Sequence, residues 1–482
     1  MDENLLLLIA GVVLAVSVLI ALMAHKIGVP SLVAFLVLGM LIGSELIGDI
    51  AFYDVHLARA VGVIALVLIL FEGGLSTSWR RLKSVAVPAA LLSTIGVIIT
   101  AGLAAVFIRL LFDLSWAESL LFGAVVSSTD AAAVFASLRF TKLKLKLART
   151  LEAETGINDP MAIALTIGLI AFLENPDYKL SSFVWLLTQQ MGWGLVLGAT
   201  LGLISIRIFS RLPRSVGSFA PVASLAACAL AYGITTSLGG SGFLAVYLVG
   251  LAIGSTPSRY RQQLVAFHEG IAFLAQVVLF IVLGVLITPD QLKSVAVPAL
   301  IISALLIVFI RPIATFTSLA FSKYSRREKL YIGLAGLRGA VPIVLGTFVL
   351  SAETLDSRFT IFNAVFFIVL ISAILQGVSV NKLAKILKLE EDIDYKETHK
   401  KRVTSNRMYE FLVESSHSIR GAMVKEAGLP KSAHLASIRR DAKKRTAKPD
   451  MLIQTGDIIF VIAPEDLEDE IYDVFARWKL RV

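Results

Sequence analysis

Polar and ionisable side chains interrupt an apolar stretch of the chain at residues 154–160, which read ETGINDP. Glu154 and Asn158 stand four positions apart and share one face of a helix, while Thr155 and Asp159 share the adjacent face. Carboxylates at membrane depth are costly and usually face a cavity, an ion path or a partner charge. The pattern therefore offers oxygen ligands to a small cation, and Asp159 offers a carboxylate that can take a proton instead. The alternative is a buried ion pair between two helices, which we favour for Glu154 and not for Asp159.

The composition is that of a polytopic membrane protein. Hydrophobic residues make up 56% of the 482 residues, charged residues make up 17%, and the mean hydropathy is +0.80. Apolar runs recur up to about residue 390, and with about 18 or more residues each can cross a hydrocarbon core of ~30 Å. The single cysteine, Cys228, excludes an internal disulfide framework and a multi-cysteine metal site.

The charge pattern argues against a nucleic-acid partner. The formal net charge is +9, but the Lys and Arg residues gather in short loops between the apolar runs. That placement fits the positive-inside rule better than a phosphate-binding surface. The first apolar run, residues 5–23, follows an acidic start and lacks a basic segment before it, so we expect a retained span and not a cleaved signal peptide.

The fold class we expect is an all-α polytopic membrane protein with 13 transmembrane helices. The expected spans are residues 4–24, 29–48, 58–76, 85–111, 116–138, 147–173, 181–207, 216–238, 241–256, 265–287, 293–318, 326–350 and 360–387. Loops after odd-numbered spans carry the basic residues, which places the N-terminus outside and the C-terminus in the cytoplasm. The expected location is the bacterial plasma membrane, with the lipid bilayer as a partner.

An internal repeat supports this arrangement. The octapeptide LKSVAVPA occupies residues 82–89 and returns at residues 292–299, 210 positions later. Three further identities fall at the same offset, the first of them between Glu118 and Glu328. Seven predicted spans separate equivalent elements, and because seven is odd the two copies should cross the membrane in opposite senses. Inverted repeats of this kind are typical of secondary transporters, with the site at the midplane between the repeats.

The repeat also indicates where two helices should be broken. Residues 127–130 align with residues 337–340, and both stretches lie in the middle of a span. The glycine and proline residues of the second stretch weaken a helix there. Broken helices at corresponding places present dipoles and backbone groups to an ion, so Asp130 and Arg338 should meet helix ends of opposite polarity. The alternative is that the glycine and proline residues only permit close helix packing.

Three more ionisable residues within the spans have two interpretations each. Glu72, near the cytoplasmic end of its span, lines a cytoplasmic funnel or only reaches the interface. Arg311 is structural, or its guanidinium reaches the lipid headgroups. His268 senses pH, or it is an interfacial histidine, and we favour the interfacial interpretation.

The last part of the chain has a different composition. Residues 1–390 form the expected membrane domain, residues 391–404 a charged linker, and residues 405–482 a small soluble α/β domain. Strands are expected at 409–413 and 457–462, with a helix over 464–478. No GxGxxG follows a strand, so a dinucleotide-binding unit is not supported. The small size of this domain favours pairing with a second copy.

These features resemble the monovalent cation/proton antiporters of the NhaP and sodium/proton exchanger group. The resemblance covers nearly all of residues 1–390 and rests on FEGGL at 71–75, Thr129-Asp130, Glu154 with Asn158-Asp159-Pro160, and GLRGAVP at 336–342. The tail, from Ile419 to Asp457, is similar to the C-terminal half of potassium-conductance regulators, the TrkA-C domain. The Rossmann half of those regulators is missing, which argues against control by NAD or ATP.

The resemblance implies roles for particular residues. It makes Asp159 and Asp130 the acids of the exchange. The cation ligands it implies are Thr129, Asp130, Thr155, Asp159 and Glu72. The supporting polar network it implies is Glu154, Asn158, Arg338 and Arg311. It further implies a homodimeric elevator carrier of 13 helices whose core bundle slides against a dimerisation domain. Electrogenic relatives carry a second Asp where this chain has Asn158, so the resemblance suggests electroneutral, one-for-one exchange.

No cofactor is expected beyond the transported K⁺ or Na⁺ and H⁺. A small nucleotide-like anion bound by the tail is one candidate regulatory ligand, and the basic residues available to it are Arg439, Arg440, Lys443 and Lys444. Between the two cations, the potassium-regulator-like tail favours K⁺ or both ions. The alternative is a Na⁺(Li⁺)/H⁺ antiporter that does not transport K⁺.

Other functional classes fit the sequence less well. An ion channel is typically built around a symmetry axis, which one internal duplication does not suggest. A proton-coupled organic anion carrier could use Arg338 as a clamp, but the predicted site is rich in carboxylates. A membrane receptor would not need the costly carboxylates within its spans. An enzyme is not expected, because neither a nucleophile–base set nor a metal-ligand cluster is visible.

Overall fold

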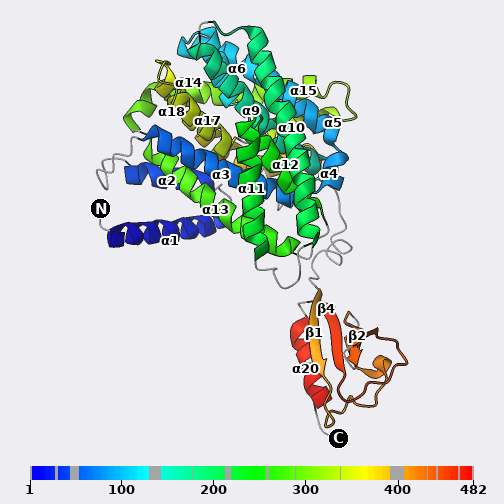
Figure 1. Cartoon of the computed structure of the whole chain (residues 1–482). Helices are drawn as coiled ribbons and strands as arrows, with labels where there is room; N and C mark the ends of the chain where they lie inside the picture. The colour runs from blue at the N-terminus through cyan, green and yellow to red at the C-terminus, as the bar shows by residue number, and fades with distance from the viewer. Residues whose placement is uncertain are drawn as a thin grey trace. The chain divides into compact units, whose positions relative to one another are not determined.

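The computed structural model describes residues 3–27, 31–43, 54–129, 143–175, 177–211, 219–256, 260–287, 289–336, 338–390, 406–430, 432–440, 443–464 and 467–479. The chain divides into two compact units, residues 1–390 and 391–482, and each is described by itself (Figure 1). The first is helical and the second contains a small sheet. Asp130, a predicted site residue, lies outside the described residues.

The helices of the first unit form two packing groups. One group, called here the scaffold helices, comprises α1 (Glu3–Ile27), α2 (Ser31–Gly43), α3 (Val55–Ser76), α10 (Leu180–Arg211), α11 (Ala220–Ser237), α12 (Gly242–Ser255) and α13 (Arg261–Val285). The other group, called the site helices, comprises α5 (Ala86–Leu91), α6 (Val97–Phe112), α7 (Trp116–Val125), α9 (Leu145–Glu174), α14 (Pro289–Leu305), α15 (Arg311–Ser318), α16 (Arg326–Leu334), α17 (Ala340–Leu350) and α18 (Arg358–Ile386). Figure 1 shows α10, α11 and α12 of the scaffold side by side.

Three shorter elements complete the first unit. The short helix α4 (Trp79–Lys83) follows α3 and leads into the site helices. One turn of π-helix, η1 (Leu92–Gly96), joins α5 to α6, and a second, η3 (Leu306–Ile310), joins α14 to α15. Each of these two joined helices is therefore continuous but contains one widened turn.

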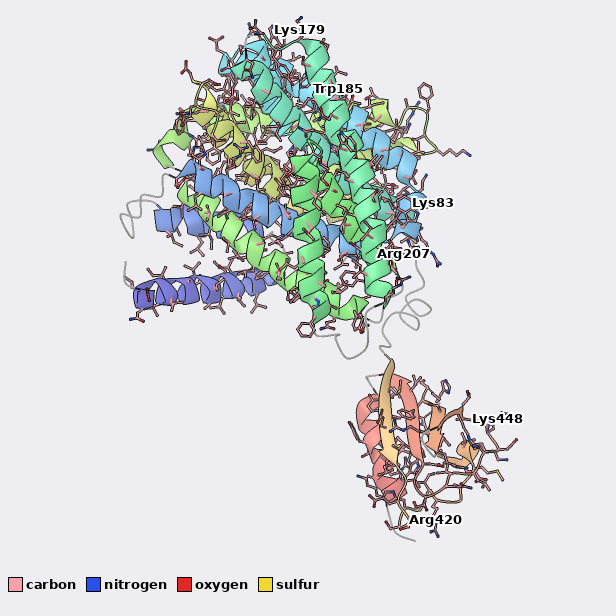
Figure 2. The ribbon with its side chains drawn as sticks, in the orientation of Figure 1. Lys83, Lys179, Trp185, Arg207, Arg420 and Lys448 are labelled. Atoms are coloured by element: carbon pink, nitrogen blue, oxygen red, sulfur yellow. The ribbon has the colours of Figure 1, made fainter. Side chains whose placement is uncertain are left out.

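Length and composition fit a membrane-spanning unit. Among the described residues, nine helices are long and apolar enough to cross a membrane, and four shorter apolar helices have 10–17 residues. Each of them overlaps one of the expected spans, while the count of 13 crossings stays a prediction. Figure 2 shows Lys179 and Arg207 toward opposite ends of α10, with Trp185 near the first of these ends. An exposed Trp and basic residues at helix ends are typical of membrane interfaces.

Glycine allows close packing inside the scaffold. A Cβ atom at Gly74 of α3 would lie 2.3 Å from the carbonyl oxygen of Tyr247 in α12. A Cβ at Gly250 of α12 would lie 2.4 Å from the carbonyl oxygen of Phe71 in α3. Backbones approach this closely only where small residues face each other. The second glycine of the FEGGL motif therefore serves helix packing.

The repeat is visible in the local structure of the site helices. Ser115 caps the start of α7 in a capping box with Glu118, and Ser325 caps α16 in the same way with Glu328. The two capping boxes stand 210 positions apart, the offset of the sequence repeat. Such boxes satisfy the first N–H groups of a helix. The two copies thus begin these helices with the same device, and their inverted orientation stays a prediction.

The expected helix break is present in the second copy. Helix α16 ends at Leu334, α17 begins at Ala340, and the described residues between them are not helical. In the first copy, α7 ends at Val125 and residues 127–129 are not helical. The alternative that glycine and proline only permit close packing is therefore wrong for the second copy.

The second unit is a four-stranded antiparallel sheet with one covering helix. The strands are β1 (Asn406–Leu412), β2 (His434–Arg440), β3 (Lys443–Thr446) and β4 (Ile458–Pro464), in the order β1-β4-β2-β3. A short 3₁₀ helix, η4 (Val424–Glu426), lies between β1 and β2, and α20 (Glu468–Lys479) follows β4. Phe475 and Trp478 of α20 pack on Phe411 of β1. The sequence predicted β1, β4 and α20 but not β2 and β3.

A buried ion pair fixes the turn before β4. Asp457 is fully buried and accepts two hydrogen bonds from Arg440, both of 2.7 Å. The same carboxylate accepts the backbone N–H of Gln454 at 2.8 Å, and Arg440 also donates to the carbonyl oxygen of Leu452. Arg440, which the sequence offered as a candidate for anion binding, therefore has a structural role in this turn.

Candidate functional site

The polar stretch of residues 154–160 lies in the middle of α9. Glu154 and Asp159 are 1% and 4% exposed, and Thr155 and Asn158 are buried with them. Pro160 also lies inside α9 and has no N–H, so the carbonyl oxygen of Gly156 lacks its usual helical partner. The helix therefore places two carboxylates, two further polar side chains and a backbone oxygen without its usual helical partner within two turns.

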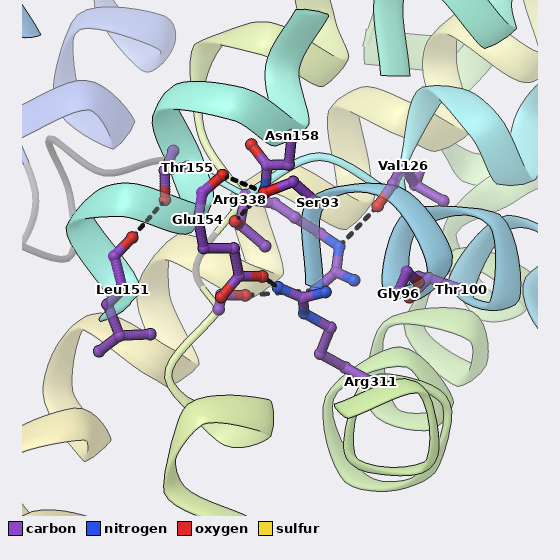
Figure 3. A network of polar contacts seen from close by, with 12 residues as sticks. Ser93, Gly96, Thr100, Val126, Leu151, Glu154, Thr155, Asn158, Arg311 and Arg338 are labelled. Atoms are coloured by element: carbon purple, nitrogen blue, oxygen red, sulfur yellow. Dashed lines mark hydrogen bonds and ion pairs between the residues drawn. The ribbon is translucent and has the colours of Figure 1, made fainter. Parts of the chain in front are cut away.

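Glu154 forms a buried ion pair with Arg311 of α15 (Figure 3). Arg311 is fully buried, so the alternative that its guanidinium reaches the lipid headgroups is wrong. The backbone oxygen of Glu154 also accepts a hydrogen bond from Ser93 of η1 at 2.7 Å. Glu154 thus joins three site helices, and the ion-pair interpretation of this residue is confirmed.

Arg338 lies in the break between α16 and α17 and contacts the break in the other copy. Its Nε donates to the carbonyl oxygen of Val126 at 2.8 Å, directly after the end of α7 (Figure 3). The carbonyl end of a helix carries partial negative charge, which a guanidinium stabilises. The expectation that Arg338 meets a helix end of opposite polarity is therefore confirmed, whereas the same expectation for Asp130 concerns a residue outside the described ranges.

Thr129 connects the first break to the polar face of α9. The side-chain Nδ2 of Asn158 donates to Oγ1 of Thr129 at 2.5 Å, and both residues are buried. Among the described residues no partner is found for Oδ1 of Asn158 or Oγ of Ser128. Thr155 donates its hydroxyl to the carbonyl oxygen of Leu151 at 3.1 Å, which leaves its oxygen lone pairs for other contacts. These are oxygen groups of the kind that bind alkali cations.

Glu72 and His268 belong to the scaffold helices. Glu72 is half-buried in the last turns of α3 and accepts a hydrogen bond from Ser76 at 2.7 Å. Its role as a cation ligand stays a prediction. His268 is 1% exposed, bonds Oγ of Ser224 through Nε2 at 2.7 Å and has its ring centroid 4.7 Å from that of Phe71. The interfacial interpretation of His268 is therefore wrong.

Two further residues of the site region were not predicted. Ser372 and Gln376 of α18 are buried and contact the break between α16 and α17. The signal was present, because a serine and a glutamine four positions apart in an apolar span share one helix face. Without the structure, nothing indicated which element that face contacts.

No cluster suited to a bound metal cofactor is found in the described parts of the chain, where groups of three or more His, Cys, Asp or Glu residues are absent. The oxygen groups near Asn158 in the described residues include the hydroxyl of Thr129 and the carboxyl groups of Asp159 and Glu154, of which Glu154 is paired with Arg311. Such a set suits transient binding of a monovalent cation.

Comparison with known proteins identifies both units. The family described as sodium/hydrogen exchanger, transmembrane, matches residues 12–386, and the TrkA-C domain matches residues 408–476. A K⁺/H⁺ antiporter NhaP from Alkalimonas amylolytica is 36% identical over 471 residues, covering 95% of this chain and 81% of that protein. A K⁺/H⁺ antiporter NhaP2 from a Shewanella species (strain MR-4) is 34% identical, covering 98% of this chain and 84% of that protein.

A more distant relative and a solved structure both come from Methanocaldococcus jannaschii. Na⁺/H⁺ antiporter 1 of Methanocaldococcus jannaschii is 29% identical over 350 residues, covering 70% of this chain and 81% of that protein. The solved structure of the sodium proton antiporter MjNhaP1 from the same organism matches with a TM-score of 0.71 and 26% identity, covering 81% of this chain and all of that one. The chain therefore belongs to the sodium/hydrogen exchanger family: it is an integral membrane antiporter of monovalent cations and protons with a TrkA-C domain.

Proposed function

We propose that this protein exchanges one K⁺ or Na⁺ for one H⁺, with Asp159 as the group that binds either ion. The observation that carries this assignment is the pairing of Glu154 with Arg311. Of the two acids in residues 154–160, Glu154 is therefore engaged in a buried ion pair, and Asp159 can exchange its proton without breaking that pair. Thr129, Thr155, Asp130 and Glu72 are the proposed further cation ligands.

Coupling follows from competition for one carboxylate. Burial disfavours the charged form of a carboxylate, whereas a bound proton or cation compensates the charge. Both loaded forms can therefore cross the barrier, while the empty, charged form would carry a large desolvation cost. With Asn158 in place of a second acid, one proton leaves for each cation bound, and the exchange is electroneutral.

The two packing groups support an elevator mechanism. In this proposal the site helices move as a body against the scaffold helices, which also form the interface of a homodimer. Helix α3 of the scaffold contacts the site helices through polar bonds at both ends. Arg59 donates to Ser351 at 3.0 Å and lies 4.1 Å from the Phe348 ring centroid, and Thr77 donates to Glu152 at 3.1 Å. Movement of the site helices would break and remake these bonds.

The preference for K⁺ rests on two observations. The two relatives described above that match nearly the whole of this chain, tail included, are named K⁺/H⁺ antiporters. The Na⁺/H⁺ antiporter of Methanocaldococcus jannaschii aligns with a smaller part of the chain. Exchange of Na⁺ or Li⁺ without K⁺ is the alternative.

A contact at the end of the first unit supports control by the TrkA-C domain. Helix α18 ends at Ile386, and the chain turns at Lys388, which has a left-handed backbone with φ of 56°. Glu390 then pairs with Leu143, and the N–H of Lys144 donates to the carbonyl oxygen of Leu389 at 3.2 Å. Because α9 starts at Leu145, the residue that precedes the tail is held next to the start of the site helix.

The decisive experiment is proton flux in proteoliposomes. We expect added K⁺, and to a smaller extent Na⁺, to dissipate an imposed pH gradient at a rate that does not depend on membrane potential. Asp159→Asn should abolish the flux and leave folding intact. Asp177→Asn, in an exposed loop, is the matched control and should behave as the wild type. Wild-type flux in Asp159→Asn would overturn the assignment of the site, and a rate that follows the potential would overturn electroneutrality.

A further inference from the structure

Two buried polar side chains of α18 lie against the break in the second repeat. Ser372 is 1% exposed and Gln376 is 2% exposed. They stand four positions apart and therefore share one helix face. Polar side chains inside a membrane-spanning helix are expensive unless they are fully hydrogen-bonded, so their partners indicate their role.

The pair bonds two backbone groups that would bond each other if the helix were not broken. In a continuous helix the N–H of Arg338 would donate to the carbonyl oxygen of Leu334, four residues earlier. Here the N–H of Arg338 donates to Oγ of Ser372 at 3.1 Å. The carbonyl oxygen of Leu334 accepts from Nε2 of Gln376 at 3.0 Å. Ser372 and Gln376 are joined to each other by a bond of 2.5 Å.

Only one arrangement of hydrogens satisfies the three bonds. A backbone N–H can only donate, so Oγ of Ser372 accepts from Arg338 and its own hydrogen is left to donate to Oε1 of Gln376. The amide then has Nε2 left to donate to Leu334. The two side chains therefore form a relay, here called the α18 clasp, that takes the place of one missing helical hydrogen bond.

The α18 clasp fixes the backbone at Arg338, and this residue reaches the rest of the site. Its guanidinium donates to the carbonyl oxygen of Val126 at the end of α7. Three residues later Thr129 accepts from Asn158, which precedes Asp159 on α9. A shift of the backbone at Arg338 would therefore change the environment of the first break and of the proposed ion ligands.

We propose that Ser372 and Gln376 are positioning residues of the transport site, because they hold the break of the second repeat open and keep Arg338 against the end of α7. The proposal rests on the proposed function for its effect on transport. Its structural part does not, because a relay that replaces a helical hydrogen bond protects the amide of Arg338 in any state that keeps the break.

Two readouts test the proposal. The first is hydrogen–deuterium exchange of the peptide that contains residues 334–340. We expect Ser372→Ala to speed exchange of the Arg338 amide by about tenfold or more, and Ser372→Thr, which keeps the hydroxyl, to restore the wild-type rate. Ser379→Ala is the matched control, because Ser379 lies on the exposed side of α18 and bonds within its own helix.

The second readout is the cation concentration for half-maximal flux, measured at several pH values on protein that has passed size-exclusion chromatography. We expect Ser372→Ala and Gln376→Leu each to raise the half-maximal cation concentration by about tenfold. The double variant should be no worse than either single one, because the relay acts as a unit. Gln376→Glu keeps the acceptor but loses the amide donor, and should resemble Gln376→Leu.

The outcomes separate the two proposals. Unchanged amide exchange in Ser372→Ala would overturn the α18 clasp whatever the transport result. Faster exchange with an unchanged half-maximal concentration and pH profile would show a structural bond that does not position the site. If the wild type itself shows no cation-dependent proton flux, the proposed function fails, while the exchange experiment still decides whether the clasp exists.

Discussion

Two acids five positions apart on one helix, Glu154 and Asp159, lie in different surroundings, and the proposed function gives them different roles. Glu154 is paired with Arg311 inside the site helices, and Asp159 lies beside the Asn158–Thr129 bond. An ion pair of this kind is held by mutual compensation, so removing one partner leaves the other as an uncompensated buried charge.

The first prediction concerns this pair. Glu154→Gln should lower the free energy of unfolding by about 3–5 kcal/mol, because Arg311 then stays buried without its counter-charge. The measurement is thermal unfolding in detergent, monitored by fluorescence-detected size-exclusion chromatography. Asp159→Asn is the matched variant and should melt near the wild type. In Glu154→Gln/Arg311→Met, which removes both charges, most of the loss should be recovered. A Glu154→Gln variant as stable as the wild type would contradict the role given to the pair.

The sequence predicted the site at this scale only in part. The polar residues of 154–160 were visible because they interrupt an apolar run. The resemblance implied one polar network for Glu154 and Arg311, but their direct pairing was not visible, since Arg311 is distant in the chain and no spacing rule joins it to Glu154. The roles of Ser372 and Gln376 were hidden for the same reason, because a helix face shows only that something polar lies opposite it.

At the scale of elements, the glycine pair at the end of α3 offers a controlled test. Gly74→Ala would place a Cβ 2.3 Å from a backbone oxygen of α12, whereas a Cβ at Gly73 would meet nothing within 4 Å. The second prediction is that Gly74→Ala lowers the free energy of unfolding by about 1–3 kcal/mol, because the added methyl group overpacks the contact between α3 and α12. Gly73→Ala should leave the free energy of unfolding unchanged or raise it by up to about 1 kcal/mol, because alanine is the better helix former.

The same unfolding measurement compares the two glycine variants. Equal stability of both variants would show that α3 and α12 can separate without cost, which the close backbone approach at Gly250 argues against. Because the two glycines are neighbours, any general effect of adding a methyl group to this helix end is shared by both variants.

Elements were predicted well where periodicity is strong. The broken helix of the second copy followed from the repeat and from its glycine and proline residues, and the structure has it between Leu334 and Ala340. Strands β2 and β3 were missed because they read HLASIRR and KKRT, with few apolar residues to alternate. Pairing with β4, and not local preference, makes a strand of β2.

At the scale of the whole molecule, the tail and the transport unit meet in the chain at Glu390. The third prediction is that deleting residues 391–482 changes the pH profile of antiport, because it removes the control by the TrkA-C domain that we propose. Leu143 and Glu390 form a non-hydrogen-bonded antiparallel pair, since the N–H of Lys144 bonds the carbonyl of Leu389 beside them. Cysteines at such positions are close enough for a disulfide.

The cross-linked variant Leu143→Cys/Glu390→Cys supplies the test. When this variant is oxidised, it should still transport cations, but its full-length and tail-deleted forms should have the same pH profile. Reduction should restore the difference between the two profiles. The matched control is the same pair of proteins without the cysteines, treated with the same oxidant. If the tail still shifts the pH profile of the oxidised protein, the signal does not pass through this pair.

The architecture of the whole molecule was the most predictable level. Composition indicated the membrane class, and the motifs indicated the family that the comparisons then showed. The resemblance implied two groups of helices, but which helices belong to each packing group could not be predicted, because apolar helix faces look alike whether they meet lipid or another helix.

Pro160 gives α9 an uneven stiffness. A helix resists bending through its ladder of hydrogen bonds, and kinks form most easily where a proline removes one rung. In α9 the missing rung lies between Pro160 and Gly156, so the most compliant point of this long helix adjoins Asp159. If the proposed site is correct, an ion that binds or leaves there acts where a small force produces the largest change of curvature.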